Sequence, residues 1–212
     1  MSAVTVIDYG ASNLLNVVRA LKYCGAQVDV TNHAATIAKA ERLILPGVGA
    51  FGDCSAALEK LGLAQPIKEY VTSGKPFLGI CVGMQVMFDV GEEFGTHKGL
   101  GIIAGKVVRI PDTGRDGKPH KIPHIGWDTL LRPADLASWN DSVLASMDNA
   151  SVYFVHSYMG VPADASHRLA TVDYNGVEIC AAVRRGNAYG CQFHPEKSGE
   201  AGLSLLKAFM ML

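Results

Sequence analysis

The sequence is poor in charge, and it has no segment built for a membrane. Only 18% of its 212 residues are charged, and acids and bases nearly balance to a formal net charge of −1. No basic stripe stands out, which argues against binding to nucleic acid or to a membrane surface. No apolar run approaches the roughly 20 residues of a membrane span, and residues 1–8 lack the features of a signal peptide. We therefore expect a cytoplasmic protein.

Cysteine is also scarce, and its arrangement excludes two common uses. The five cysteines are odd in number, widely spaced and without a Cys-x-x-Cys pair. This pattern argues against a disulfide framework and against a zinc site. The sequence shows no histidine cluster and no phosphate-binding loop, so it indicates no metal and no organic cofactor. Four cysteines read as ordinary core thiols, and Cys81 differs from them by its context.

The distribution of apolar residues predicts an α/β fold in one domain over residues 1–212. Hydrophobic residues make up 49% of the chain, enough for a sizeable core, and no internal repeat or low-complexity linker divides it. In the first half, strand-like runs alternate with helical patterns, which favours a largely parallel central sheet with helices on both faces. The predicted strands are residues 4–9, 27–31, 42–45 and 76–81, and the predicted helices are 13–24, 34–40, 54–61 (capped by Asp53) and 84–88.

The second half predicts an antiparallel β extension of that core. Strand-like runs follow one another there with few helical patterns between them, and Asn175-Gly176 between two such runs is a strong hairpin signal. An amphipathic helix over residues 200–211 closes the chain. The expected strands are residues 101–110, 151–158, 169–174, 177–185 and 188–193.

Cys81 lies in a Gly-x-Cys-x-Gly turn between a predicted strand and a predicted helix. Glycines two residues before and two after a nucleophile permit the tight turn of a nucleophile elbow. The thiol would then stand at the end of the strand, beside the positive end of the helix, where its thiolate is favoured. A buried core thiol in a glycine-rich turn fits the same residues.

A candidate base for this thiol comes from the far end of the chain. His194 ends a predicted strand, and Pro195 favours an extended conformation at His194. Glu196 therefore projects to the same side as His194 and could accept a hydrogen bond from one ring nitrogen while the other faces Cys81. Carboxylate, imidazole and thiol in this order follow the logic of a catalytic triad. A strand-end histidine in a solvated turn is the alternative.

The Pro-Gly-Val-Gly loop after the third predicted strand offers donors for an oxyanion. Glycine-flanked backbone amides can reach the oxygen of a tetrahedral intermediate. Gly47, Val48 and Gly49, together with the amide of Val82 behind the nucleophile, are the candidates. Glycine-rich loops also bind phosphate, but this loop matches neither of the common phosphate-binding patterns.

Six short sequence motifs, spread over nearly the whole chain, include most of these candidate residues. They stand at residues 6–14, 45–51, 79–85, 122–127, 153–158 and 194–198. The blocks Gly-Ile-Cys-Val-Gly-Met-Gln and Gln-Phe-His-Pro-Glu-Lys-Ser resemble the two signatures of class I (triad-type) glutamine amidotransferases. Taken together and in this order, the six blocks most resemble the glutaminase subunits of imidazole glycerol phosphate synthase.

The resemblance implies roles for individual residues. Cys81 corresponds to the nucleophile, His194 to the acid and base, and Glu196 to the carboxylate that orients it. The residues implied in binding the substrate glutamine are Gln85, Glu93 (through the α-ammonium group), Ser157 and Tyr158 (largely through their backbone). The chain departs from the family's usual residues at Ser12, Val82 and Asp128, all outside the triad, and the family commonly has Asn at the last position.

The resemblance also implies a reaction and a partner. Glutamine would be hydrolysed to glutamate and ammonia through a thioester on Cys81. The ammonia would pass to a separate (β/α)8-barrel cyclase subunit in a heterodimer, which makes imidazole glycerol phosphate and aminoimidazole carboxamide ribotide for histidine biosynthesis. In this family the oxyanion loop is thought to be poorly arranged until the acceptor nucleotide binds the partner, and Val48, between two glycines, is where a peptide flip is easiest.

Three other functions stay open at this point. The chain could be the glutaminase of another synthase, serving anthranilate, pyridoxal phosphate or guanylate synthesis, although the residues around Gln85 and Lys197 speak against this. It could be a stand-alone cysteine hydrolase that acts without a partner. It could also be a non-catalytic subunit, which the intact triad residues disfavour.

Overall fold

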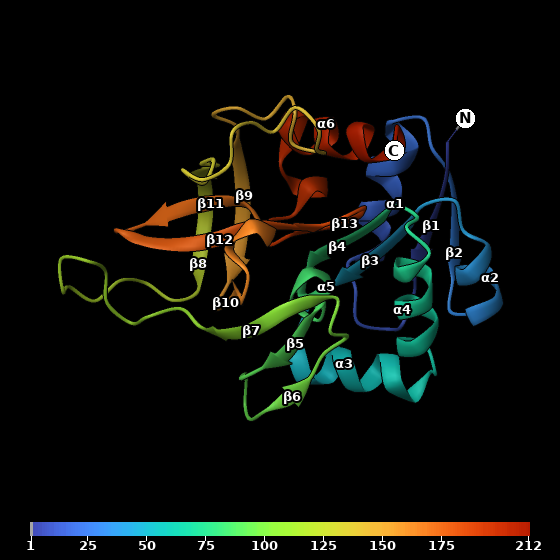
Figure 1. Ribbon diagram of the computed structural model, residues 1–212, viewed down its shortest axis with the longest axis horizontal. Coiled ribbons are helices and arrows are strands. Elements are labelled where there is room, and N and C mark those ends of the chain that lie inside the picture. Colours follow the sequence, from blue (N-terminus) through green and yellow to red (C-terminus); the bar gives the residue numbers. More distant parts are fainter. Residues whose placement is uncertain (1) are drawn as a thin grey trace.

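The computed structural model describes residues 2–212 and is built around a seven-stranded sheet (Figure 1). Five of its strands, β13, β4, β3, β1 and β2, are parallel, with β2 at one edge, and β12 and β11 extend the sheet antiparallel at the other edge. In spatial order the strands are β11 (Arg168–Tyr174), β12 (Val177–Arg185), β13 (Ala188–Cys191), β4 (Phe77–Cys81), β3 (Leu43–Gly47), β1 (Ala3–Ile7) and β2 (Gln27–Thr31).

Most of the parallel strands are buried because helices cover both sides of the sheet, whereas β2 at its edge is largely exposed. β3 and β4 are buried at every residue, as expected for central strands with continuous apolar sequences. Figure 1 shows α1 and α6 on one side of the sheet and α3 with α4 on the other. The helices are α1 (Leu14–Tyr23), α2 (Ala34–Lys39), α3 (Phe51–Lys60), α4 (Ala64–Thr72), α5 (Val82–Gln85) and α6 (Gly199–Met210), with short 3₁₀ turns η1 (Ala165–His167) and η2 (Pro195–Lys197).

Two smaller sheets complete the β extension, which is antiparallel except for the parallel pair of β5 and β7. One has the order β10-β7-β5-β6, and the other is the pair β8-β9, in which His124 lies opposite His156. Their strands are β5 (Phe88–Gly91), β6 (His97–Lys98), β7 (Ile103–Arg109), β8 (His124–Thr129), β9 (Ser151–His156) and β10 (Tyr158–Pro162). The predicted fold class is therefore confirmed, with the extension divided between the edge of the main sheet and these two sheets.

Two local predictions were wrong. The predicted helix 84–88 is only the single turn α5, which begins directly after Cys81, and Phe88 already belongs to β5. Its apolar residues are buried on all sides, so their spacing did not distinguish a helix from a strand. Asp53 does not cap α3, because that helix begins two residues earlier, at Phe51. The N–H of Phe51 instead donates to Glu93 Oε2 at 2.7 Å.

The helices of residues 2–212 are all too short or too polar to cross a membrane.

Candidate active site

The predicted site residues meet at the carboxyl ends of the parallel strands. β1, β3, β4 and β13 run in the same direction, so the loops after them come together at one edge of the sheet. A cavity of about 310 Å³ opens there. Nine of the eleven candidate residues line it: Val48, Gly49, Cys81, Val82, Gln85, Glu93, Ser157, Tyr158 and His194. Gly47 and Glu196 do not line it.

Cys81 occupies a strained turn that only small neighbours permit. Its φ is 55° and its ψ is −116°, an unusual conformation for a residue with a side chain. A Cβ atom on Gly83 would lie 1.9 Å from the carbonyl oxygen of Leu45, so no other residue fits there. The turn therefore lifts the thiol to the end of β4, as the predicted nucleophile elbow requires. Directly behind it, Val82 is the first residue of α5, where an α-helix leaves its N–H without an intrahelical partner.

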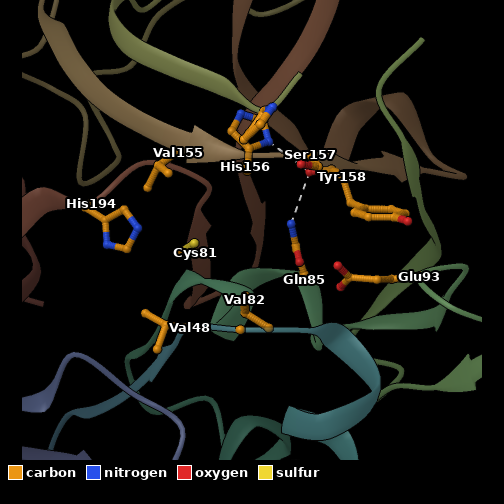
Figure 2. Close-up of a pocket in the computed structure, with 12 residues that line it drawn as sticks. Val48, Cys81, Val82, Gln85, Glu93, Val155, His156, Ser157, Tyr158 and His194 are labelled. Atoms are coloured by element: carbon orange, nitrogen blue, oxygen red, sulfur yellow. Dashed lines mark hydrogen bonds between the residues drawn. The ribbon is translucent and has the colours of Figure 1, made fainter. Parts of the chain in front are cut away.

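His194 lies between Cys81 and Glu196. Its Nδ1 is 2.8 Å from Glu196 Oε1, and its ring points towards Cys81 (Figure 2). Both members of the His194–Glu196 pair are almost fully buried. The two residues reach this arrangement because His194 is extended and Pro195 then opens the turn η2. The predicted geometry of thiol, imidazole and carboxylate is therefore present.

The environment of His194 favours its charged form. Burial alone would lower the pKa of His194, but hydrogen bonds to Cys81 and Glu196 and the negative charge on both outweigh it. The net result is a pKa raised to about 9. At neutral pH the ring is therefore an imidazolium, which stabilises a neighbouring thiolate and holds a proton for a leaving group.

The oxyanion loop is held by two hydrogen bonds on Val48. The N–H of Val48 donates to the carbonyl oxygen of Ala11 at 3.0 Å, and its carbonyl accepts from Cys54 Sγ at 3.4 Å. Gly49 follows with a φ of +94°, in the region that glycine adopts without strain. In this conformation the Val48 amide is occupied and the loop presents Gly49 to the cavity.

Gln85 links the floor of the cavity to two other segments. Its Nε2 donates to the carbonyl oxygen of Tyr158 at 3.1 Å and to Gln192 Oε1 at 3.0 Å. Gln192 Nε2 in turn lies 3.8 Å from Cys81 Sγ. Figure 2 shows Cys81 and His194 towards one end of the cavity and Glu93 and Tyr158 towards the other, with Gln85 between them. The carboxylate of Glu93 also accepts the N–H of Phe51 at the start of α3.

Three polar residues of the site were missed by the sequence reasoning. Gln192 is fully buried beside the thiol, Asn13 Nδ2 donates to Glu196 Oε1 at 3.4 Å, and Ser198 Oγ donates to the carbonyl oxygen of His194 at 2.7 Å. Gln192 could have been found from its position, since it lies two residues before His194 in an extended segment. Asn13 and Ser198 belong to blocks used for the resemblance, but their contacts depend on the folded arrangement.

Across residues 2–212, no three His, Cys, Asp or Glu side chains come together as a metal site would require.

Comparison with known proteins places these features in a family. A model of the family described as "Glutamine amidotransferase class-I" matches residues 5–212. The chain is 50% identical to "Imidazole glycerol phosphate synthase subunit HisH 1" of Legionella pneumophila (strain Lens), over 100% of both chains. It is 48% identical to the HisH subunit of Syntrophotalea carbinolica, over 97% of this chain and 98% of the relative.

Solved structures agree at the level of the fold. PurLQS from Thermotoga maritima superposes with a TM-score of 0.73 at 20% identity, covering 100% of this chain and 99% of that one. A structure described as a glutamine amidotransferase gives a TM-score of 0.71 at 16% identity, covering 96% and 98%.

Proposed function

The chain belongs to the class-I glutamine amidotransferases and, within them, to the HisH subunits of imidazole glycerol phosphate synthase, and we propose that Cys81, His194 and Glu196 carry its glutaminase reaction. The observation that carries this proposal is the placement of the His194 ring between a strained, buried thiol and a buried carboxylate 2.8 Å away.

The reaction proceeds through a thioester. The Cys81 thiolate attacks the side-chain amide carbon of glutamine, forming a C–S bond and an oxyanion. The imidazolium of His194 gives its proton to the amide nitrogen, the C–N bond breaks, and ammonia leaves. His194, now neutral, takes a proton from water, whose oxygen attacks the thioester and releases glutamate and the thiolate. Glu196 accepts from His194 Nδ1 throughout and so fixes the tautomer of the ring.

The oxyanion is stabilised by backbone amides. Val82 offers its N–H at the start of α5, next to the nucleophile. A second donor comes from the loop of Val48 and Gly49. Since the Val48 amide is engaged by Ala11 in the structure, this loop has to change its conformation before that amide can serve. Low activity of the subunit alone follows from this arrangement.

Glutamine binds with its side chain towards Cys81 and its α-carbon towards Glu93. The carboxylate of Glu93 attracts the α-ammonium group, and it is already fixed by the N–H of Phe51. Ser157 and Tyr158 hold the substrate through their backbone. Gln85 keeps that segment in place through the Tyr158 carbonyl, and its own carbonyl oxygen is left for the substrate.

The ammonia is used by a second subunit. The relatives are named as subunits of imidazole glycerol phosphate synthase, and we assign to this chain a heterodimer with its (β/α)8-barrel cyclase, which makes imidazole glycerol phosphate and aminoimidazole carboxamide ribotide. Free ammonia would be protonated in water, so transfer inside a complex preserves it. We propose that the docking face includes two exposed side chains of β8, Trp127 and Ile125. The ring centroids of Trp127 and Tyr153 are 6.0 Å apart, and the amine of Lys197 lies over the ring of Tyr153. The single domain over residues 1–212 and the cytoplasmic location stay predictions.

The triad is tested by labelling with a glutamine-derived electrophile such as diazo-oxonorleucine. The full chain should lose one equivalent of free thiol at Cys81, and peptide mapping should find the label on no other cysteine. Cys81→Ala should not react, and His194→Gln should react much more slowly. Labelling of Cys81 at an unchanged rate in His194→Gln would overturn the assigned role of the histidine.

A further inference from the structure

A chain of hydrogen bonds runs from the surface to the backbone that lines the cavity. Asp128 Oδ2 lies 2.6 Å from His124 Nε2, His124 Nδ1 lies 3.0 Å from His156 Nε2, and His156 Nδ1 lies 2.8 Å from the carbonyl oxygen of Tyr158. The two histidines are opposite each other on β8 and β9 and are buried, while the Asp128 side chain is 35% exposed. The same Tyr158 carbonyl accepts from Gln85.

Counting protons along this chain fixes the direction of each bond. A carbonyl oxygen only accepts, so His156 Nδ1 carries a proton and donates to Tyr158. Burial lowers the pKa of His156 to about 3, so the ring is neutral and its Nε2 is an acceptor. His124 Nδ1 must therefore donate to His156.

One further proton is needed at the outer end. A neutral His124 would present an unprotonated Nε2 to the Asp128 carboxylate, and two acceptors cannot form a bond of 2.6 Å. Three bonds require three protons, whereas two neutral imidazoles bring only two. The third proton therefore lies between His124 and Asp128, as an imidazolium paired with a carboxylate. The rings of Tyr174 and Phe154, 4.2 Å and 4.9 Å from that of His124, favour a cation between them.

We propose that Asp128 and His124 are positioning residues of the glutamine site: they share one proton, which fixes the tautomer of His156 and thereby holds the backbone of Ser157 and Tyr158 in the shape that binds the substrate. This inference rests on the proposed function. When residue 128 offers no hydrogen-bonding group, His124 Nε2 has no fixed partner, and the protons of the two rings are free to move to their other nitrogens. The Tyr158 carbonyl then loses its fixed donor, and glutamine binds more weakly.

Other titratable groups face the same chain, and the experiment has to separate them. Tyr174 on β11 covers His124, His120 in the preceding loop stacks on Tyr174, and His194 faces His156 from the triad. All of these remain when only Asp128 is changed, so a comparison of variants of residue 128 at one pH leaves their contribution the same.

The decisive variant is Asp128→Asn, because it keeps the shape and reverses one donor. The amide N–H of the asparagine can donate to His124 Nε2, which leaves both histidines neutral and still supplies a proton to each of the three bonds. Glu41→Gln is the matched control, since it makes the same change from carboxylate to amide at an exposed side chain that pairs with Arg42, before the start of β3 and so at the opposite end of the parallel strands from the site.

The first measurement is nitrogen NMR of isotope-labelled histidine in the full chain. Wild type should show two buried histidines protonated on both nitrogens, His194 and a second one assigned to His124 by its loss in His124→Asn, and a neutral His156 protonated on Nδ1. In Asp128→Asn the His124 signal should become that of a neutral ring, whereas Glu41→Gln should match wild type. A neutral His124 in the wild type at neutral pH would overturn the proposal.

The second measurement is calorimetric binding of glutamine in the Cys81→Ser background, which prevents turnover by the thiol. At one neutral pH, Asp128→Asn should keep the Kd of the parent, whereas Asp128→Ala should raise the Kd about tenfold, the effect of losing one hydrogen bond. An unchanged Kd in Asp128→Ala would overturn the positioning role, even though glutamine binding itself would still support the proposed function. Absence of glutamine binding in every variant, together with no labelling of Cys81, would instead mean that the proposed function had failed and this inference with it.

Discussion

The backbone N–H of Val48 donates to the carbonyl oxygen of Ala11 at 3.0 Å, so a candidate oxyanion donor is engaged by a neighbouring loop while the triad is already assembled. The Val48 carbonyl is held as well, by Cys54 Sγ. A change in the conformation of this loop requires that one or both of these hydrogen bonds break, and the two glycines beside Val48 permit such a change. The nucleophile and its base are therefore prepared in advance, and the oxyanion donors are the part left to be arranged.

We expect Gly49→Pro to uncouple the glutaminase from its partner. Proline is fixed near a φ of −65°, whereas Gly49 has a φ of +94°, and proline also removes the N–H of residue 49. Stimulation of glutamate release by the cyclase subunit and its nucleotide should fall by about a hundredfold or more, the effect of losing one oxyanion donor. Retained labelling of Cys81 by diazo-oxonorleucine would show that the triad is intact. Stimulation like that of wild type would contradict this account of the loop.

Glu196→Gln should shift the pH profile of glutamine hydrolysis. Glu196 is one of the groups that raise the pKa of His194 to about 9, and the imidazolium is the form that protonates the leaving ammonia. For wild type we expect kcat/KM to fall as pH rises through about 9. In the variant this alkaline limb should move to lower pH, because the neutral amide stabilises the imidazolium less. An unmoved limb in the full complex would argue against the ion pair.

The same raised pKa predicts a pH-dependent contribution to stability. Since the folded state binds the proton of His194 more tightly than the unfolded state, this contribution is complete below the ordinary histidine value of about 6.5. It is then lost as pH rises through about 9. Urea unfolding of wild type and His194→Gln at several pH values should show a difference in the free energy of unfolding that shrinks over this window. A difference that grows with pH would have the wrong sign.

Two variants of Glu93 should distinguish its effect on substrate binding from its effect on stability. Glu93→Gln keeps an oxygen for the N–H of Phe51 but removes the charge. We expect little change in stability and a KM for glutamine raised about tenfold, since hydrogen bonds to charged groups are stronger than neutral ones. Glu93→Ala should also lose about 1 kcal/mol of stability, the usual cost of removing an oxygen that caps a helix start. An unchanged KM in both variants would remove Glu93 from the substrate site.

Local sequence signals predicted the elements of the main sheet and the turns at Cys81 and His194 because these depend on short-range rules. The meeting of the two side chains depends on the pairing of β13 with β4, and it was expected only from the logic of a triad and from the family resemblance. The glycines around Cys81 and the proline after His194 determine the backbone conformation within two or three residues. Apolar runs such as β4 can likewise be recognised from neighbouring residues alone. The helix expected over residues 84–88 failed because buried apolar residues carry no periodicity. The engagement of Val48 by Ala11 and the chain from Asp128 to Tyr158 join segments far apart in sequence, so no local pattern contains them.

The measurement that tests the central claim most directly is glutamate release from glutamine by the purified chain, alone and then with the cyclase subunit and its nucleotide. We predict negligible release by the chain alone and strong stimulation in the complete mixture, abolished by Cys81→Ala. High activity of the chain alone, indifferent to the cyclase and the nucleotide, would contradict the coupled mechanism and leave only a cysteine hydrolase with the same triad.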